Sequence, residues 1–148
     1  MISALDSSII LDVVTDDPSF ADASEALLCR AASEGLLVAC ECVLAEIRPA
    51  FRDADEFDTF LRDWQIEFVP ASLESAKRAG EQFQTYLERG GRQGRIVADF
   101  LIGAHASLLA DRLLARDRGY LRDYFQELAL LSPVDLSKPF GEGDKGKD

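Results

Sequence analysis

The sequence has 148 residues, of which 47% are hydrophobic and 29% are charged, a composition typical of one folded domain and not of a disordered chain. The formal net charge of −11 argues against a domain that coats nucleic acid by bulk electrostatic attraction and favours a basic protein partner. Acids gathered around a metal ion would count toward the same total, so a nuclease is not excluded. There is no apolar run of about 18 residues for a membrane span and no signal-peptide pattern, so we expect a cytosolic protein.

The three cysteines are Cys29, Cys40 and Cys42, an odd number without the spacing of a disulfide framework, which fits a reducing compartment. The Cys-x-Cys pair at 40 and 42 could begin a soft-metal site, but no second cysteine pair completes it. The competing interpretation is that these residues are small buried hydrophobic side chains.

Short apolar segments alternate with helical patterns along the chain. The strands that we predict are residues 2–5, 36–40, 66–69, 112–115 and 128–131. The helices that we predict are residues 9–14, 19–34, 43–51, one from about 53, one from 72 to the glycines at 90 and 91, one from 96, and 119–124. This alternation is typical of an α/β fold, in which a parallel sheet is covered by helices on both sides. Residues 1–135 form one domain in this interpretation, and residues 136–148 form a disordered, Gly- and charge-rich tail.

Several helix starts carry capping residues. Ser7 and Ser8 are positioned to cap the helix predicted from residue 9. Asp53 with Glu56 three residues later has the pattern of a capping box, and Ser72 is positioned to cap the long helix that follows.

The helix that begins at Ile96 is apolar on nearly every side, which is typical of a buried, central helix. One carboxylate, Asp99, stands in the middle of this apolar sequence. Leaving an unpaired carboxylate in such surroundings costs several kcal/mol (roughly), so Asp99 needs a cation or hydrogen-bond donors. A second acid, Asp117, follows the strand predicted at 112–115.

Four acids with mostly apolar neighbours are expected near one crevice, because ligands of open α/β sheets bind outside the carboxyl ends of the strands. Asp6 directly follows the first predicted strand, and Asp117 lies just past the end of the fourth. Glu46 lies within two turns of the end of the second, and Asp99 opens the helix that leads into the fourth. An oxygen-only set suits Mg²⁺ or Mn²⁺ and not zinc, and such an ion can activate water against a phosphodiester. Buried acids satisfied by helix caps and arginines remain an open alternative.

Four segments of the sequence resemble the PIN-domain family and, within it, the VapC-type toxin ribonucleases of toxin–antitoxin pairs. They are ALDSSIILDV, VLAEI, GRIVADFLIGAHA and LLARDRGYLRDYF, in the family's order, and the resemblance extends from the first strand to about Leu131. It implies a three-layer α/β/α fold with a central, mainly parallel sheet of about five short strands. It also implies metal-dependent RNA endonuclease activity, homodimerisation and neutralisation by a cognate antitoxin protein.

The resemblance also implies roles for single residues. It implies one acidic quartet that binds the metal and carries catalysis: Asp6, Glu46, Asp99 and Asp117. Ser8 matches a small polar residue that commonly supports the site. The family often has Thr or Ser two residues before the last acid, and here this residue is Ala115, which removes a hydroxyl that could orient the RNA.

Arginines and the single histidine each have two interpretations. Arg92 and Arg95 lie in an acid-free loop and are candidates for RNA contact. Arg116 and Arg118 could contact phosphate or pair with neighbouring acids. His105 could shuttle protons, or it could pack beside the core with a structural hydrogen bond, which is the interpretation that we favour.

Two further acids and one apolar stripe also have two interpretations each. Asp12 and Asp123 could add outer-sphere contacts to a metal site, but we interpret both as exposed helical acids. One stripe of large apolar residues is expected to pack against the core or a partner, with base stacking as the alternative: Phe57, Phe60, Leu61 and Trp64.

Three hypotheses of function follow. The first is a Mg²⁺- or Mn²⁺-dependent endoribonuclease toxin that leaves 5′-phosphate and 3′-hydroxyl ends. The second is a PIN-like protein-binding module with weak or no catalysis, which Ala115 and the acidic charge favour slightly. The third is a phosphatase or phospho-acceptor that uses Asp6 as nucleophile, which Ser8 and the lack of a lysine near Asp117 disfavour. Metal-dependent RNA cleavage separates the first from the second, and an essential Asp99 separates the first from the third.

Overall fold

The central element is one five-stranded parallel sheet. The computed structural model describes residues 1–92, 97–116 and 119–133. Its strands are β1 (Ile2–Leu5), β2 (Leu36–Ala39), β3 (Ile66–Phe68), β4 (Arg112–Leu114) and β5 (Ala129–Leu131). Their order across the sheet is β3-β2-β1-β4-β5, and each neighbouring pair is parallel. The predicted α/β class and the parallel sheet are therefore confirmed.

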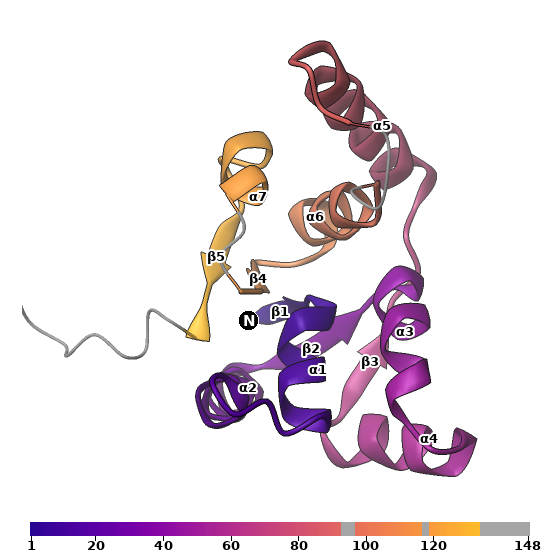
Figure 1. The fold of residues 1–148 in the computed structure, drawn as a ribbon, viewed down its shortest axis with the longest axis vertical. Helices are drawn as coiled ribbons and strands as arrows, with labels where there is room; N and C mark the ends of the chain where they lie inside the picture. The colour runs from indigo at the N-terminus through magenta and orange to yellow at the C-terminus, as the bar shows by residue number, and fades with distance from the viewer. Residues whose placement is uncertain (93–96, 117–118, 134–148) are drawn as a thin grey trace, which may run out of the picture.

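Helices cover both faces of this sheet. They are α1 (Ser7–Val14), α2 (Ala21–Glu34), α3 (Glu41–Ile47), α4 (Ala54–Asp63), α5 (Leu73–Glu88), α6 (Val97–Leu109) and α7 (Gly119–Tyr124), with a short 3₁₀ turn η1 (Arg48–Ala50) after α3. Helices α1 and α2 lie on one side of the sheet, and α5, α6 and α7 lie on the other (Figure 1). This arrangement is the expected three-layer α/β/α architecture.

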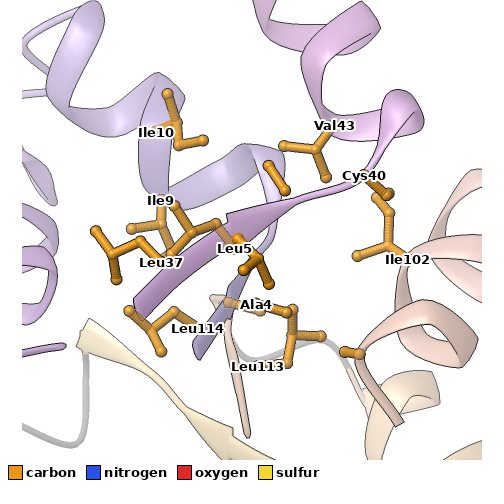
Figure 2. Close-up of a cluster of buried hydrophobic side chains, with 14 of the residues drawn as sticks. Ala4, Leu5, Ile9, Ile10, Leu37, Cys40, Val43, Ile102, Leu113 and Leu114 are labelled. Atoms are coloured by element: carbon orange, nitrogen blue, oxygen red, sulfur yellow. The ribbon is translucent and has the colours of Figure 1, made fainter. Parts of the chain in front are cut away.

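Apolar strand residues fill the space on both sides of the sheet. Leu113 of β4 lies toward Ile102 of α6, whereas Leu5 of β1 lies toward Ile9 of α1 (Figure 2). All four side chains are at most 2% exposed, and fully burying each contributes about 1.5–3 kcal/mol. Because both faces are packed, the carboxyl ends of β1 and β4 are held firmly, and the site described below is built on them.

Helix α6 is the buried helix that its sequence predicts, with one correction. Phe100 and Ile102 are nearly inaccessible, as expected. The prediction that Asp99 lies in the middle of the apolar helix was wrong, because α6 begins at Val97 and Asp99 belongs to its first turn. Asp99 is only half-buried there, and an acid in the first turn is stabilised by the partial positive charge of the helix start.

Two of the three predicted N-caps are confirmed. The Asp53 carboxylate accepts a hydrogen bond from the Glu56 amide (2.8 Å), and the Ser72 hydroxyl caps α5. The capping box predicted at Asp53 was wrong, because the Glu56 carboxylate accepts from the Arg52 amide (2.7 Å) and not from the Asp53 amide. The prediction that Ser7 and Ser8 cap the first helix was wrong. Asp6 is the cap, because its carboxylate accepts from the Ser8 amide and the helix already begins at Ser7.

Other boundaries move by one to four residues. The helix predicted at 19–34 begins at Ala21, because the Asp17 carboxylate accepts from the Ser19 and Phe20 amides in a turn that precedes it. The helix predicted at 43–51 begins at Glu41 and ends at Ile47, where η1 follows. The strands predicted at 36–40, 66–69 and 112–115 end one residue earlier, and the last strand starts one residue later.

In the described part of the chain, no helix has the length and apolar character needed to cross a membrane. The predicted tail at 136–148 lies outside the described residues.

Candidate active site

Asp6 lies at the carboxyl end of β1, where β1 and β4 meet. Its backbone N–H donates to the carbonyl of Leu114 (2.9 Å), which fixes it beside the end of β4. The residue is 3% exposed, and its carboxylate accepts from both the amide (3.1 Å) and the hydroxyl of Ser8. A buried carboxylate with two donors on one oxygen is held in one orientation. Ser8 therefore contacts Asp6 in the manner expected of a supporting residue.

Glu46 reaches the same edge from α3. It lies on an exposed part of that helix, and its Oε1 accepts a hydrogen bond from the hydroxyl of Ser7 (3.0 Å). Because Ser7 follows Asp6 in the chain, this bond ties Glu46 to the start of α1, next to Asp6. The sequence predicts Ser7 only as a cap and not as a partner of Glu46, although its place directly after the first acid was the available signal.

Asp99 approaches from α6, which packs against α3. Cys42 is a half-buried thiol on α3. Burial raises the pKa of this thiol, and the neighbouring Cys40 and the negative charges of Glu46, Glu41 and Asp99 raise it further. The packing of α6 against α3 brings the helix that carries Asp99 beside the helix that carries Glu46.

The donor set at this edge fits a hard divalent cation. Asp6, Glu46 and Asp99 offer only carboxylate oxygens, and Mg²⁺ is commonly held by one or two carboxylates with water completing its shell. Within residues 1–92, 97–116 and 119–133, no three Asp, Glu, His or Cys residues are grouped closely enough to hold an ion between them. Asp117, the fourth predicted acid, lies outside the described residues.

The prediction that Asp12 is an exposed helical acid was wrong. Its side chain is fully buried and accepts hydrogen bonds from the Ser24 hydroxyl (2.7 Å) and from Nε of Arg116 (3.0 Å), and its second oxygen is paired with Nη2 of the same arginine. Of the two interpretations of Arg116, pairing with an acid is the one that the structure shows. The reason is that α1 turns the face bearing Asp12 toward α2 and the end of β4.

The other predicted contacts with RNA are only partly described. Arg92 is exposed at the end of the described segment, and Arg95 and Arg118 lie outside the described residues. Asp123 is exposed on α7, as predicted.

His105 packs in the core with a structural contact, which is the interpretation that we favoured from the sequence. It is 1% exposed, its Nε2 lies 2.7 Å from the carbonyl oxygen of Val69, and burial lowers its pKa. Cys40 is buried in the core as a free thiol, and its pKa is raised by burial, which fits the hydrophobic interpretation of that cysteine.

The apolar stripe of α4 packs as predicted. The ring of Phe51 lies 5.3 Å from the rings of both Phe57 and Phe60, and Phe60 lies 6.3 Å from Trp64, measured between centroids. Leu61 also packs against the core.

Asp6 and Glu46, at the carboxyl edge of the parallel sheet, form what we call the acidic edge. The fold and this edge together define a class of protein, an α/β domain with carboxylates at the carboxyl ends of parallel strands. The PIN domain family model matches residues 4–125, and the chain therefore belongs to the PIN-domain family. No curated protein sequence matches the chain.

Solved structures similar to this chain have low sequence identity and show the shared fold. One is VapBC2 from Rickettsia felis bound to a promoter DNA fragment, with 20% identity, a TM-score of 0.66, and coverage of 89% of this chain and 98% of the other. VapBC-1 from nontypeable Haemophilus influenzae has 20% identity, a TM-score of 0.62, and coverage of 90% and 99%. FitAcB from Neisseria gonorrhoeae has 16% identity, a TM-score of 0.61, and coverage of 90% and 99%.

Proposed function

We propose that this protein is a Mg²⁺- or Mn²⁺-dependent endoribonuclease, the VapC-type toxin of a type II toxin–antitoxin pair. Members of the PIN-domain family are generally nucleases, and the chain belongs to that family. The observation that supports the proposal is that Asp6 directly follows β1 at the carboxyl edge of the parallel sheet, and that Ser7 beside it donates a hydrogen bond to Glu46 of α3. Asp99, in the first turn of α6, is the third acid in this proposal. Asp117 is the fourth acid in this proposal.

Hydrogen bonds orient the proposed metal-binding carboxylates before substrate arrives. Ser8 holds Asp6 through two donors, and Ser7 holds Glu46. A divalent ion bound at such carboxylates lowers the pKa of water and neutralises phosphate oxygens during in-line attack. Because the acids are fixed by the sheet edge and by these hydroxyls, little reorganisation is needed when the reaction begins. Arg92, Arg95 and Arg118 are the proposed contacts with the RNA backbone.

The proposed partners are a cognate antitoxin and a second copy of the chain in a homodimer. Several solved structures similar in fold are VapBC complexes, two of them bound to DNA. The net charge of −11 complements a basic partner segment. We propose that such a segment covers the acidic edge and blocks access of RNA to it.

The second candidate function is a PIN-like protein-binding module with weak catalysis. It is favoured by Ala115, which is 2% exposed and whose amide donates to the Leu131 carbonyl (3.0 Å). The family often has a hydroxyl at this position, and alanine supplies none. If binding is the main function, the chain should bind its partner tightly while cutting RNA slowly.

Cleavage of a mixed cellular RNA pool tests the proposal. Purified protein is incubated with Mg²⁺ or Mn²⁺ and with EDTA, beside the variants Asp6→Asn and Asp99→Asn. Asp123→Asn is a matched control, because it removes an exposed acid on α7. Cleavage that needs metal, vanishes in the first two variants and persists in the control supports the nuclease. Equal RNA cleavage by the wild type and all three variants would contradict the proposal.

A further inference from the structure

A partly buried ion pair joins α1 to the second residue after β4. Asp12 of α1 is inaccessible to solvent, and both of its carboxylate oxygens are paired with the guanidinium of Arg116. The Ser24 hydroxyl of α2 adds a third donor (2.7 Å). The guanidinium carbon of Arg116 also lies 4.3 Å from the ring centroid of Phe20. We call these four residues the Asp12–Arg116 cluster: Asp12, Phe20, Ser24 and Arg116.

The cluster continues into the proposed metal site through one serine. The backbone N–H of Arg116 donates to the Ser8 hydroxyl oxygen (3.3 Å), and that hydroxyl donates to the carboxylate of Asp6. A hydroxyl has one hydrogen, so accepting from Arg116 leaves that hydrogen free to point at Asp6. Fixing the main chain at residue 116 therefore also fixes the Asp6 carboxylate.

The fold alone does not require this ion pair at this place. A buried carboxylate must be paired, but replacing a whole buried ion pair by apolar residues is often neutral or stabilising. Strand β4 ends at Leu114, and the Ala115 amide makes a further bond to β5, so Arg116 is not needed to complete the sheet. What the pair fixes is the main chain at residue 116, beside the carboxyl end of β4.

A second ion pair at the other end of β4 provides an internal comparison. Arg112 is 7% exposed and donates to the Ser3 hydroxyl (2.8 Å) and to the Glu34 carboxylate. This group has the same composition as the Asp12 pair, an arginine with a carboxylate and a serine. It lies at the amino end of the strand, so it can stabilise the sheet but cannot position Asp6.

We propose that Asp12 and Arg116 are positioning residues for the metal site, an inference that rests on the proposed nuclease function. Asp12 holds the Arg116 side chain, the Arg116 amide holds the Ser8 hydroxyl, and Ser8 orients Asp6. Loss of the Asp12 charge, or of the bidentate pairing by Arg116, loosens Asp6 without removing a metal-binding carboxylate. Metal affinity then falls on the order of tenfold or more, the usual range for losing a group that orients a ligand.

Amide hydrogen exchange in the metal-free protein tests the first half of the inference independently of activity. Asp12→Asn keeps the shape of the side chain, and Arg116→Lys keeps the charge but loses the bidentate pairing. In both variants, the Arg116 amide should exchange at least about tenfold faster than in the wild type while core amides stay protected. The matched control Glu34→Gln should leave the Arg116 amide unchanged. Unchanged exchange at Arg116 in both variants would overturn the proposal.

Calorimetric titration with Mn²⁺ tests the second half. The half-saturating concentration should rise on the order of tenfold in Asp12→Asn and Arg116→Lys and stay at the wild-type value in Glu34→Gln. An equal Mn²⁺ affinity in all four proteins would overturn the positioning role. Failure of the nuclease proposal is distinguishable from failure of the positioning role. In that case the wild type itself would bind Mn²⁺ without cutting RNA, or would not bind Mn²⁺.

Discussion

Replacing Asp6 by asparagine should separate the structural role of this residue from its proposed role in catalysis. In the fold, Asp6 caps α1 by accepting from the Ser8 amide and hydroxyl. Asparagine caps helices about as well as aspartate, so the cap survives in Asp6→Asn. Removing one negative charge near Glu46 also lowers repulsion. The free energy of unfolding without metal should therefore change by no more than about 0.5 kcal/mol.

The effect on catalysis should be much larger. A metal-bound carboxylate site supplies several kcal/mol of transition-state stabilisation, and loss of about 3 kcal/mol lowers kcat/KM about a hundredfold. Asp6→Ala should lose the same activity and also the helix cap, which stabilises the fold by about 1 kcal/mol. The two variants should thus differ in stability but not in activity.

Two assays on the same protein check this prediction. Urea unfolding without metal gives the stability of the wild type, Asp6→Asn and Asp6→Ala. Adding Mn²⁺ should raise the midpoint of thermal unfolding of the wild type but not of Asp6→Asn or Asp6→Ala. A ligand at a hundred times its Kd stabilises the folded state by about 2.7 kcal/mol. If Asp6→Asn cuts RNA at the wild-type rate, or if its activity falls only in step with its folded fraction, the reasoning is refuted.

Further predictions concern the fold and the support of the site. Because burial lowers the pKa of His105, its contribution to the free energy of unfolding should be complete above the unfolded-state pKa of about 6.5. That contribution should fall as the pH drops toward the lower pKa of the folded state. Urea unfolding at a series of pH values should show this decrease in the wild type and not in His105→Gln. Gly103→Ala should destabilise by about 1–3 kcal/mol in urea, since an added Cβ would lie 2.6 Å from a buried phenylalanine ring, whereas Gly80→Ala, with open space around it, should be neutral or stabilising. Ser7→Ala should weaken Mn²⁺ binding on the order of tenfold by releasing Glu46, as measured by calorimetry; an unchanged affinity would show that this bond does not orient the carboxylate.

Local sequence patterns were sufficient to predict the elements of the fold. Strands buried on both faces form continuous apolar runs, and the alternation with helices then predicts a parallel sheet. The same reasoning placed Asp6 at the end of a strand, because parallel strands end at one edge. Boundary errors arose where one side chain decides the end of a helix, as when Asp6 and not a serine caps α1.

Local sequence patterns could not predict the polar contacts that hold Asp6 and Glu46. Asp12 looked like an exposed helical acid, yet it is buried against Arg116, 104 residues further along the chain. The Ser7–Glu46 bond spans 39 residues. Hydrophobic periodicity identifies the apolar face of a helix but not a polar residue buried on it, because that burial depends on which partner the fold brings opposite.

The sequence by itself thus determined the α/β class, the parallel sheet and the place of Asp6 directly after a strand. These features follow from local propensity and from the rule that parallel strands share a carboxyl edge. Only the tertiary structure decided how Asp6 is held. Asp12, Arg116 and Ser8 meet through the packing of α1 and α2 against the end of β4, and a carboxylate as deeply buried as Asp12 is tolerated only because that packing brings Arg116 and Ser24 to it.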